Sequence, residues 1–141
     1  MATVQSQMIS GRYRIERLTS HWSKNKTGVC LLSPECSNST EDLSHMLHSC
    51  RALENTREKL LSYTQEYSSN FPADIKQLSL QLCNKASPTF VQFLLDCSVL
   101  PSVISATQLH GKFVLDCLFT ISRTWVYCLH RERLKILGRW N

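Results

Sequence analysis

Three cysteines and two histidines lie within the stretch CLLSPECSNSTEDLSHMLHSC, residues 30–50. Cysteine thiolates and neutral histidines are the side chains that hold structural zinc in a tetrahedral arrangement. Four of them follow one another in the order Cys, Cys, His, Cys, with gaps of five, eight and four residues: Cys30, Cys36, His45 and Cys50. A turn at Pro34 would let the first two thiols face inward, and the second pair straddles the end of a short predicted helix. The window is therefore a candidate zinc site.

The spacing alone leaves a second interpretation open, in which these cysteines are ordinary buried side chains. The gap of five residues between Cys30 and Cys36 exceeds the about two to four residues usual in zinc fingers. Free cysteine is among the most buried residue types, and four other cysteines are predicted to be buried on apolar helix faces: Cys83, Cys97, Cys117 and Cys128. Cys30 and Cys36 differ because their segment is polar and rich in turn residues. We expect His48 to lie at the surface or to contact the ligands without binding the metal itself. His21 is a weaker alternative to His45 as a metal ligand.

Length and composition favour a single globular unit in a reducing compartment. A chain of 141 residues with 43% apolar content can build one core. An odd number of cysteines, seven, and a start without an apolar run favour an intracellular location, cytoplasmic or nuclear, over a secreted one. The most apolar stretch, residues 113–130, contains Asp116 and Arg123 and is too short and too polar to span a bilayer. We expect no membrane partner.

Apolar periodicity predicts helices over most of the chain. The expected ranges are 3–22, about 40–50, 51–67, 73–83 and about 103–137. The last range carries apolar residues at four-residue intervals, which predicts a core-facing stripe: Phe113, Cys117, Ile121, Trp125 and Leu129. The bundle is expected to form around six side chains: Leu47, Leu60, Leu78, Phe93, Leu118 and Trp125. Residues 30–36 predict a short extended or hairpin element.

The predicted fold is all-α, a small helical bundle with an N-terminal knuckle-like element made of a hairpin and a helix. Two parts are expected within one compact unit. Residues 1–52 form a basic helix and the knuckle, and residues 53–141 form the bundle packed against them.

The net charge of +5 is concentrated at the two ends of the chain. Residues 1–30 carry five Lys/Arg and one Glu, residues 31–122 carry six cations against nine acids, and residues 123–141 carry five against one. This asymmetry suggests a polyanionic partner, although solvated helix faces would give the same pattern. Basic side chains interleaved with aromatic rings precede Cys30 and are the candidate nucleic-acid contacts: Arg12, Tyr13, Arg14, Arg17, Trp22, Lys24 and Lys26. Alternatively, Trp22 is buried in the hydrophobic core and does not contact a nucleic acid.

The first half of the chain also resembles a known family. The matching features are SGRYR, the pair HW, G-x-C-x5-C with Pro34 inside, an acidic residue before L-x-H-x-L, and C-x-A-L followed by Arg57. Together they resemble the C-terminal zinc-binding region of non-LTR retrotransposon polyproteins, which follows the reverse transcriptase domain. The resemblance implies zinc as cofactor, and the ligands of the family fall on four residues: Cys30, Cys36, His45 and Cys50.

The resemblance implies a binding function without catalysis for this chain. The parent polyproteins copy RNA into DNA through a paired-aspartate metal site, but the chain has no adjacent aspartates and no phosphate-cradling glycine loop. We therefore expect a non-catalytic module that binds RNA or DNA, such as element RNA or target DNA, with no small-molecule substrate. A reverse transcriptase domain outside this chain is a further expected partner. The alternative is a structural or protein-interaction helical domain stapled by zinc.

Overall fold

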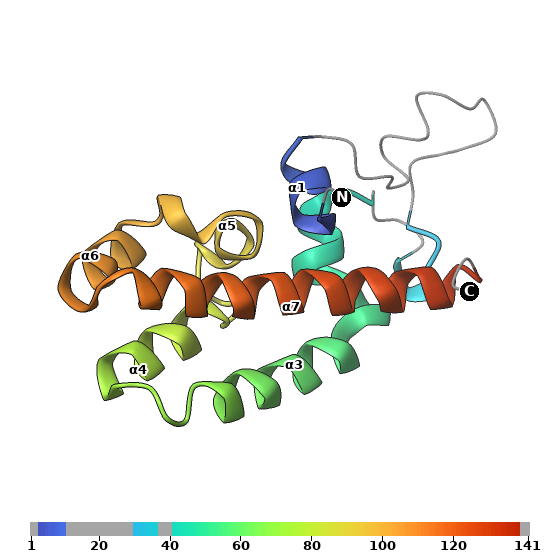
Figure 1. Ribbon diagram of the computed structural model, residues 1–141. Helices are drawn as coiled ribbons and strands as arrows, with labels where there is room; N and C mark the ends of the chain where they lie inside the picture. Colours follow the sequence, from blue (N-terminus) through green and yellow to red (C-terminus); the bar gives the residue numbers. More distant parts are fainter. Residues whose placement is uncertain (1–2, 11–29, 37–40, 139–141) are drawn as a thin grey trace.

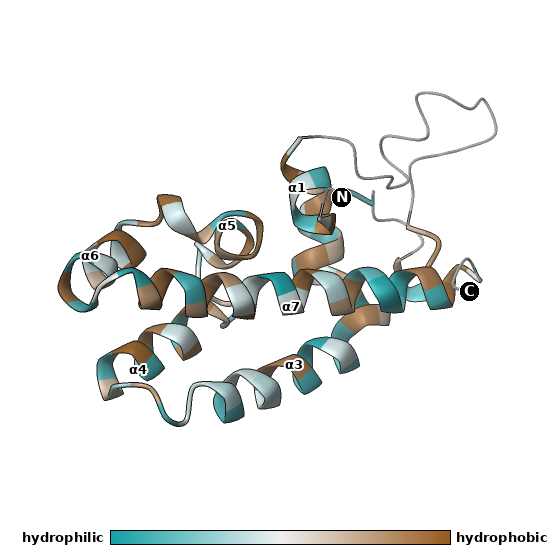
Figure 2. Ribbon diagram, in the orientation of Figure 1, coloured by the Kyte–Doolittle hydropathy of each residue, from teal (hydrophilic) through white to brown (hydrophobic). Residues whose placement is uncertain are grey.

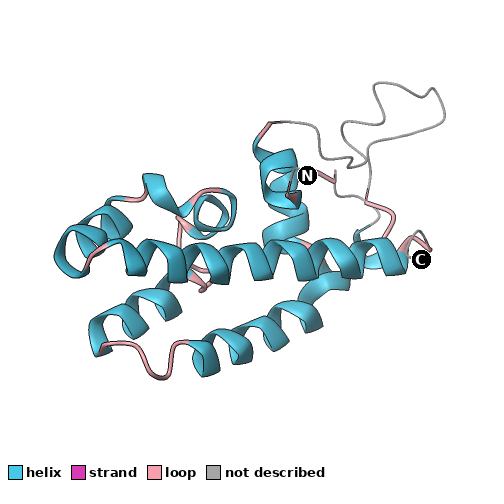
Figure 3. Ribbon diagram, in the orientation of Figure 1, coloured by secondary structure: helices cyan, strands magenta, loops and turns pink. Residues whose placement is uncertain are grey.

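The computed structural model describes residues 3–10, 30–36 and 41–138 of the chain (Figure 1). Helices joined by short loops account for the described architecture, and no strand occurs in these three ranges (Figure 3). The prediction of an all-α fold is confirmed. The hairpin expected at residues 30–36 was wrong, because this segment forms a single 3₁₀ turn, Pro34–Cys36. Pro34 lacks a backbone N–H and suits a turn better than a paired strand.

Five helices form the bundle, and their ends coincide with residues that stop or start a helix. They are α3 (Glu54–Tyr67), α4 (Ala73–Leu82), α5 (Phe90–Leu95), α6 (Pro101–His110) and α7 (Lys112–Ile136). Pro72 directly precedes α4, and Pro101 occupies the first turn of α6, where no intrahelical N–H is required. The single helix predicted for residues 103–137 was wrong. Gly111 adopts φ 93°, which L side chains rarely adopt, and it separates α6 from α7.

Helix α7 crosses the whole molecule and carries much of the core (Figure 1). It packs against α1, α3, α5, α6 and the turns that surround residue 50. Its buried residues are Val114, Leu118, Ile121, Ser122, Trp125, Val126, Leu129 and Arg133. Trp125 is fully buried, meets Phe90 edge to face at 5.7 Å, and donates its indole N–H to Thr64 at 2.9 Å. These contacts join α7 to α3 and α5.

The buried stripe of α7 differs at its beginning from the predicted one. Phe113 is 46% exposed and Cys117 is partly exposed, whereas Val114 and Leu118 are fully buried. Figure 2 shows that hydrophobic and hydrophilic residues alternate along α7. Because four residues turn about 400° around an α-helix, a strict four-residue repeat drifts by about 40° per step. The predicted stripe therefore leaves the core face toward its N-terminal end. Among the six expected core residues, only Leu78 is partly exposed.

Helix α1 (Val4–Ile9) is shorter than the predicted helix 3–22, whose second half lies outside the described residues. The Gln5 amide donates to the Leu94 carbonyl at 2.5 Å and to the Ser122 hydroxyl at 3.2 Å, and Met8 is buried beside them. These buried contacts dock α1 on α5 and α7. Across the described ranges, no helix combines the length and the apolar composition needed to cross a membrane.

Candidate metal centre

Two turns position the four candidate ligands. Cys36 ends the 3₁₀ turn, where its N–H donates to the Ser33 carbonyl at 3.0 Å. His45 opens a π-helical turn, His45–Ser49, and the Cys50 N–H donates back to the His45 carbonyl at 2.7 Å. In a π turn, the i→i+5 hydrogen bond places residues five apart about one full turn from each other. In an α-helix, residues five apart are separated by about 500°, which is well past one turn. The π turn therefore brings His45 and Cys50 to the same side of the backbone.

The four ligand atoms form one compact group, which we call the Cys-His group: Cys30, Cys36, His45 and Cys50. All of these atoms lie within 4.8 Å of one another. The Cys50 Sγ lies 3.8 Å from the Cys30 Sγ and 3.9 Å from the Cys36 Sγ. Sulfur atoms bound to one tetrahedral ion at ~2.3 Å would be ~3.8 Å apart. The spacing of the three thiols is therefore compatible with a single metal ion between them.

Burial and hydrogen bonding also suit a metal ion. The three thiols are almost completely buried, and the His45 Nε2 atom is buried without a hydrogen-bond partner. Burial lowers the pKa of His45, which favours the neutral imidazole that binds metals. Burial raises the pKa of Cys30, and it raises the pKa of Cys50 to about 12. Without a cation these thiols stay protonated, so metal binding has to release protons.

Arg57 supports the end of the π turn from α3. Its guanidinium donates to the carbonyls of Met46 and Leu47, each at 2.9 Å, and of Cys50 at 2.8 Å. It also pairs with Glu54 at 3.0 Å, and its side chain is buried. The last carbonyls of a helical turn have no intrahelical donor, and this one side chain satisfies three of them. Sequence reasoning missed this role, because an arginine at this position of a helical pattern fits a solvated surface equally well.

A buried ion pair joins the same region to the end of α7. Glu41 and Arg133 are 0% and 2% exposed, and the Arg133 Nε atom donates to a Glu41 carboxylate oxygen at 3.0 Å. A second bond from the same guanidinium makes the pair bidentate. Arg133 is one of the five cations of residues 123–141. From the sequence, these cations could equally have been the solvated end of a helix. The burial of Arg133 was not predictable, because Glu41 is 92 residues away in sequence.

The other cysteines and histidines among the described residues are not part of the Cys-His group. Cys83 and Cys97 are buried, and burial raises the pKa of each to about 12. Cys117 and Cys128 are partly exposed. His48 contacts the Ser49 hydroxyl and the Lys85 carbonyl, each at 2.8 Å, and His21 lies outside the described residues. The prediction of burial is thus confirmed for Cys83 and Cys97 and holds only in part for the other two.

The predicted nucleic-acid contacts cannot be placed, because all seven lie between residues 11 and 29, outside the described ranges: Arg12, Tyr13, Arg14, Arg17, Trp22, Lys24 and Lys26. The residues that flank this segment are described. Ser10 follows the docked helix α1, and Cys30 belongs to the Cys-His group. The cationic segment is therefore bounded by two buried attachments.

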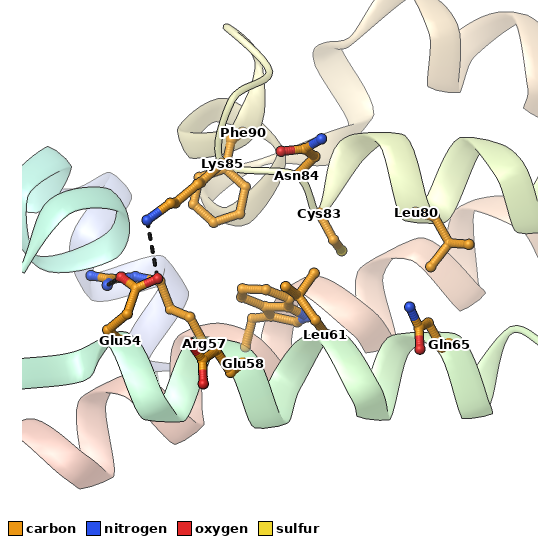
Figure 4. Close-up of a pocket in the computed structure, with 11 residues that line it drawn as sticks. Glu54, Arg57, Glu58, Leu61, Gln65, Leu80, Cys83, Asn84, Lys85 and Phe90 are labelled. Atoms are coloured by element: carbon orange, nitrogen blue, oxygen red, sulfur yellow. Dashed lines mark hydrogen bonds and ion pairs between the residues drawn. The ribbon is translucent and has the colours of Figure 1, made fainter. Parts of the chain in front are cut away.

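A cleft of about 350 Å³ lies between α3, α4 and the turn that precedes α5 (Figure 4). Phe90, Trp125 and Leu61 are among the residues that line it. The Lys85 ammonium reaches Glu54 at 3.0 Å, and this contact lowers the pKa of the Glu54 carboxyl. Glu54 also pairs with Arg57, which holds the carbonyls of the π turn. The pair Lys85–Glu54 therefore links the turn before α5 to Arg57.

The chain was compared with protein-family models, with curated proteins and with solved structures, and none of the three comparisons found a match.

Proposed function

We propose that the Cys-His group binds one zinc ion, which fixes residues 30–36 and 41–53 on the bundle. We call these two ranges the metal-site segment. The clustering of four ligand atoms within 4.8 Å carries this proposal. Thiolate and imidazole ligands in tetrahedral number favour zinc over magnesium or calcium, which prefer oxygen ligands. Four protein ligands leave no open position for a substrate or a water molecule, which favours a structural role.

We further propose that the chain is a non-catalytic module that binds RNA or DNA. The segment between Ser10 and Cys30 carries five cations and one acid. The described residues on either side of this segment are attached to the bundle, α1 through Gln5 and Cys30 through the Cys-His group. Five cations in one segment supply the charge that a phosphate backbone attracts. The resemblance to retrotransposon zinc-binding regions supports the same function.

The second candidate function is a structural or protein-interaction domain stapled by zinc. The buried pair Glu41–Arg133 and the Arg57 contacts favour it, because they integrate the metal-site segment into the bundle without involving any exposed cation. In this case the basic ends of the chain would be solvated surface.

Metal analysis and nucleic-acid binding together test the proposal. We expect one zinc per wild-type chain and loss of zinc in Cys36→Ser, whereas the matched control Cys117→Ser keeps the metal. Neutralising Arg12, Arg14 and Arg17 should weaken binding of single-stranded RNA or DNA and flatten its salt dependence by ~0.7 to 0.9 log units per lost phosphate contact. A chain without zinc under reducing conditions contradicts the metal proposal. A zinc-loaded chain that binds no nucleic acid near physiological salt supports the second candidate.

A further inference from the structure

A row of side chains winds obliquely around the exposed side of α7, apart from the metal centre, from Phe119, which is partly buried against the core, to the exposed Lys135. Its members occur at successive four-residue intervals and form what we call the α7 ridge: Phe119, Arg123, Tyr127, Arg131 and Lys135. Neighbouring members are separated by ~6 Å along the helix axis. Tyr127 at the middle lies two residues from the buried Trp125, ~200° around the helix. The centre of the ridge therefore faces away from the core.

Aromatic rings and guanidinium groups alternate along the ridge and contact one another. The Arg123 guanidinium lies 4.9 Å from the centre of the Phe119 ring, and the Arg131 guanidinium lies 5.8 Å from the centre of the Tyr127 ring. These cation–π contacts restrict two long side chains before any partner binds. Tyr127 is nevertheless 48% exposed, and Arg123 is exposed as well. Part of the Tyr127 ring is therefore accessible to a partner.

The charge of the ridge is positive. Its members carry three cations and no acid, and the acidic residues of α7 are Asp116, two turns before Arg123 on the same face, and Glu132. Arg133, which lies between the last two ridge cations, points to the other side and is held by Glu41. The ridge thus ends at the part of the molecule that contains the metal-site segment (Figure 1). A polyanion is the partner that complements this charge.

We propose that the α7 ridge binds single-stranded RNA or DNA. The phosphates lie against the exposed Arg123 and Lys135, and an unpaired base stacks on the exposed part of Tyr127, whose ring Arg131 contacts. The half-exposed ring favours a strand with accessible bases over an acidic protein. A membrane surface would need an apolar outward face, whereas this face also carries Asp116 and two threonines. The inference rests on the proposed nucleic-acid binding and adds a second contact, independent of residues 11–29.

Fluorescence anisotropy with a labelled single-stranded oligonucleotide and the zinc-loaded full chain tests this inference. Tyr127→Ala should raise the Kd about tenfold because it removes a stacking ring, and Tyr127→Phe should leave the Kd unchanged. The double variant Arg123→Gln/Lys135→Gln should reduce the slope of log Kd against log salt by ~1.4, which corresponds to two phosphate contacts. The matched control Lys59→Gln/Lys76→Gln removes two cations from α3 and α4 and should reduce the slope much less. Circular dichroism checks that each variant is folded.

The possible outcomes separate the ridge from the proposed function. The ridge is refuted if Tyr127→Ala binds like Tyr127→Phe and the Arg123/Lys135 variant matches its lysine control. If the variant with Arg12, Arg14 and Arg17 neutralised still loses affinity in that case, the proposed function stands without the ridge. A wild-type chain that binds no oligonucleotide near physiological salt overturns both. Tighter binding to polyglutamate or to anionic vesicles than to the oligonucleotide also overturns the assignment of a nucleic-acid partner.

Discussion

The metal-site segment and the helical bundle both contain fully buried side chains, but the interactions that hold the two regions in place differ. The bundle contains helices whose apolar faces meet around α7, with Trp125 and Leu118 fully enclosed. The metal-site segment consists of short 3₁₀ and π turns. It also contributes apolar side chains to the core, namely Leu32, Met46, Leu47 and Leu53. In addition it contains the Cys-His group, the carbonyls that Arg57 satisfies and the pair Glu41–Arg133, and these polar contacts help to compensate for ordering a short irregular segment.

The cysteines show the same contrast within one residue type. Cys50 and Cys83 are both buried, and burial raises the pKa of each to about 12. Cys83 contacts the Thr64 hydroxyl at 3.9 Å, within the bundle. Cys50 faces two further thiols at 3.8 and 3.9 Å and lies beside the unpaired His45 Nε2 atom. Burial alone therefore does not identify a ligand, and the neighbours of the thiol do.

Metal removal should have the largest effect, and it should affect the two regions unequally. Structural zinc contributes an apparent ~10–16 kcal/mol in small fingers, so chelation should unfold the metal-site segment. The apolar core of the bundle should keep α3 to α7 helical. Hydrogen exchange by residue measures this difference, with loss of protection expected at residues 41–53 and retention at Leu118 and Trp125.

A core variant provides the control for this experiment. Leu118→Ala should destabilise the bundle by about 2–5 kcal/mol, because it opens a cavity in α7, while the chain still binds one zinc. If chelation instead abolished protection throughout the molecule, the two regions would be one cooperative unit. If chelation changed nothing, the metal proposal would be wrong.

The pair Glu41–Arg133 should have the next largest effect, because it joins the two regions. Arg133→Met leaves the buried Glu41 carboxylate without its cation, and the loss of one partner of a buried ion pair costs about 3–5 kcal/mol. The double variant Glu41→Leu/Arg133→Met should recover most of this loss, since no charge stays buried. Urea denaturation of both variants measures the difference. A double variant as unstable as Arg133→Met would show that the pair contributes more than charge compensation.

The bundle could be predicted from the sequence because its signals are local. Apolar residues at helical spacing gave the ranges of α3 and α4 closely, and Pro101 marks the start of α6. The order of four candidate ligands within 21 residues also sufficed to nominate the Cys-His group, since few alternatives exist in such a short window. Periodicity over many residues averages out single exceptions such as Phe113.

The contacts that hold the metal-site segment could not be predicted, because they are not local or not periodic. A π turn has no simple propensity signal, although it decides whether His45 and Cys50 converge. The partners Glu41 and Arg133 are far apart in sequence, and only the path of α7 brings them together. Arg57 fits a helical pattern equally well as a surface residue. The seven predicted nucleic-acid contacts stay a prediction.

A smaller effect is expected at Gly111, inside the bundle and away from the metal. A Cβ at this position would meet no neighbouring atom within 4 Å, so only the backbone resists substitution. Gly111→Ala should cost about 1–3 kcal/mol, because φ 93° with ψ 177° strains any L side chain. Thermal unfolding of the zinc-loaded protein measures this loss, and the zinc content should not change. An unchanged or higher Tm would indicate that α6 and α7 can merge into the single helix that the sequence predicted.

The smallest effect is expected on the stability of the protein at acidic pH, where the bundle and the metal-site segment should respond at different pH values. The exposed Asp74 carboxylate in α4 accepts a hydrogen bond from His110 at 2.6 Å, which lowers the pKa of Asp74 below its ordinary value of 3.8. The stability that it contributes is complete above that value and is lost only as the pH falls through the lower folded pKa. In the proposed metal centre, burial raises the pKa of Cys30, and it raises the pKa of Cys50 to about 12, so protons should compete with zinc for these thiolates at a milder pH than the one that titrates Asp74.

We therefore expect two acid transitions in the wild-type chain. Zinc release and loss of the metal-site segment should come first, below pH ~6.5, and the contribution of Asp74 should disappear only below pH ~4. Asp74→Asn should leave the first transition and the Tm at neutral pH nearly unchanged, because the pair lies at the surface, and should alter only the second. Circular dichroism and a zinc-sensitive dye, followed over one pH titration, record both events. A single transition, in which helix content and zinc are lost together, would mean that the bundle depends on the metal as strongly as the metal-site segment does.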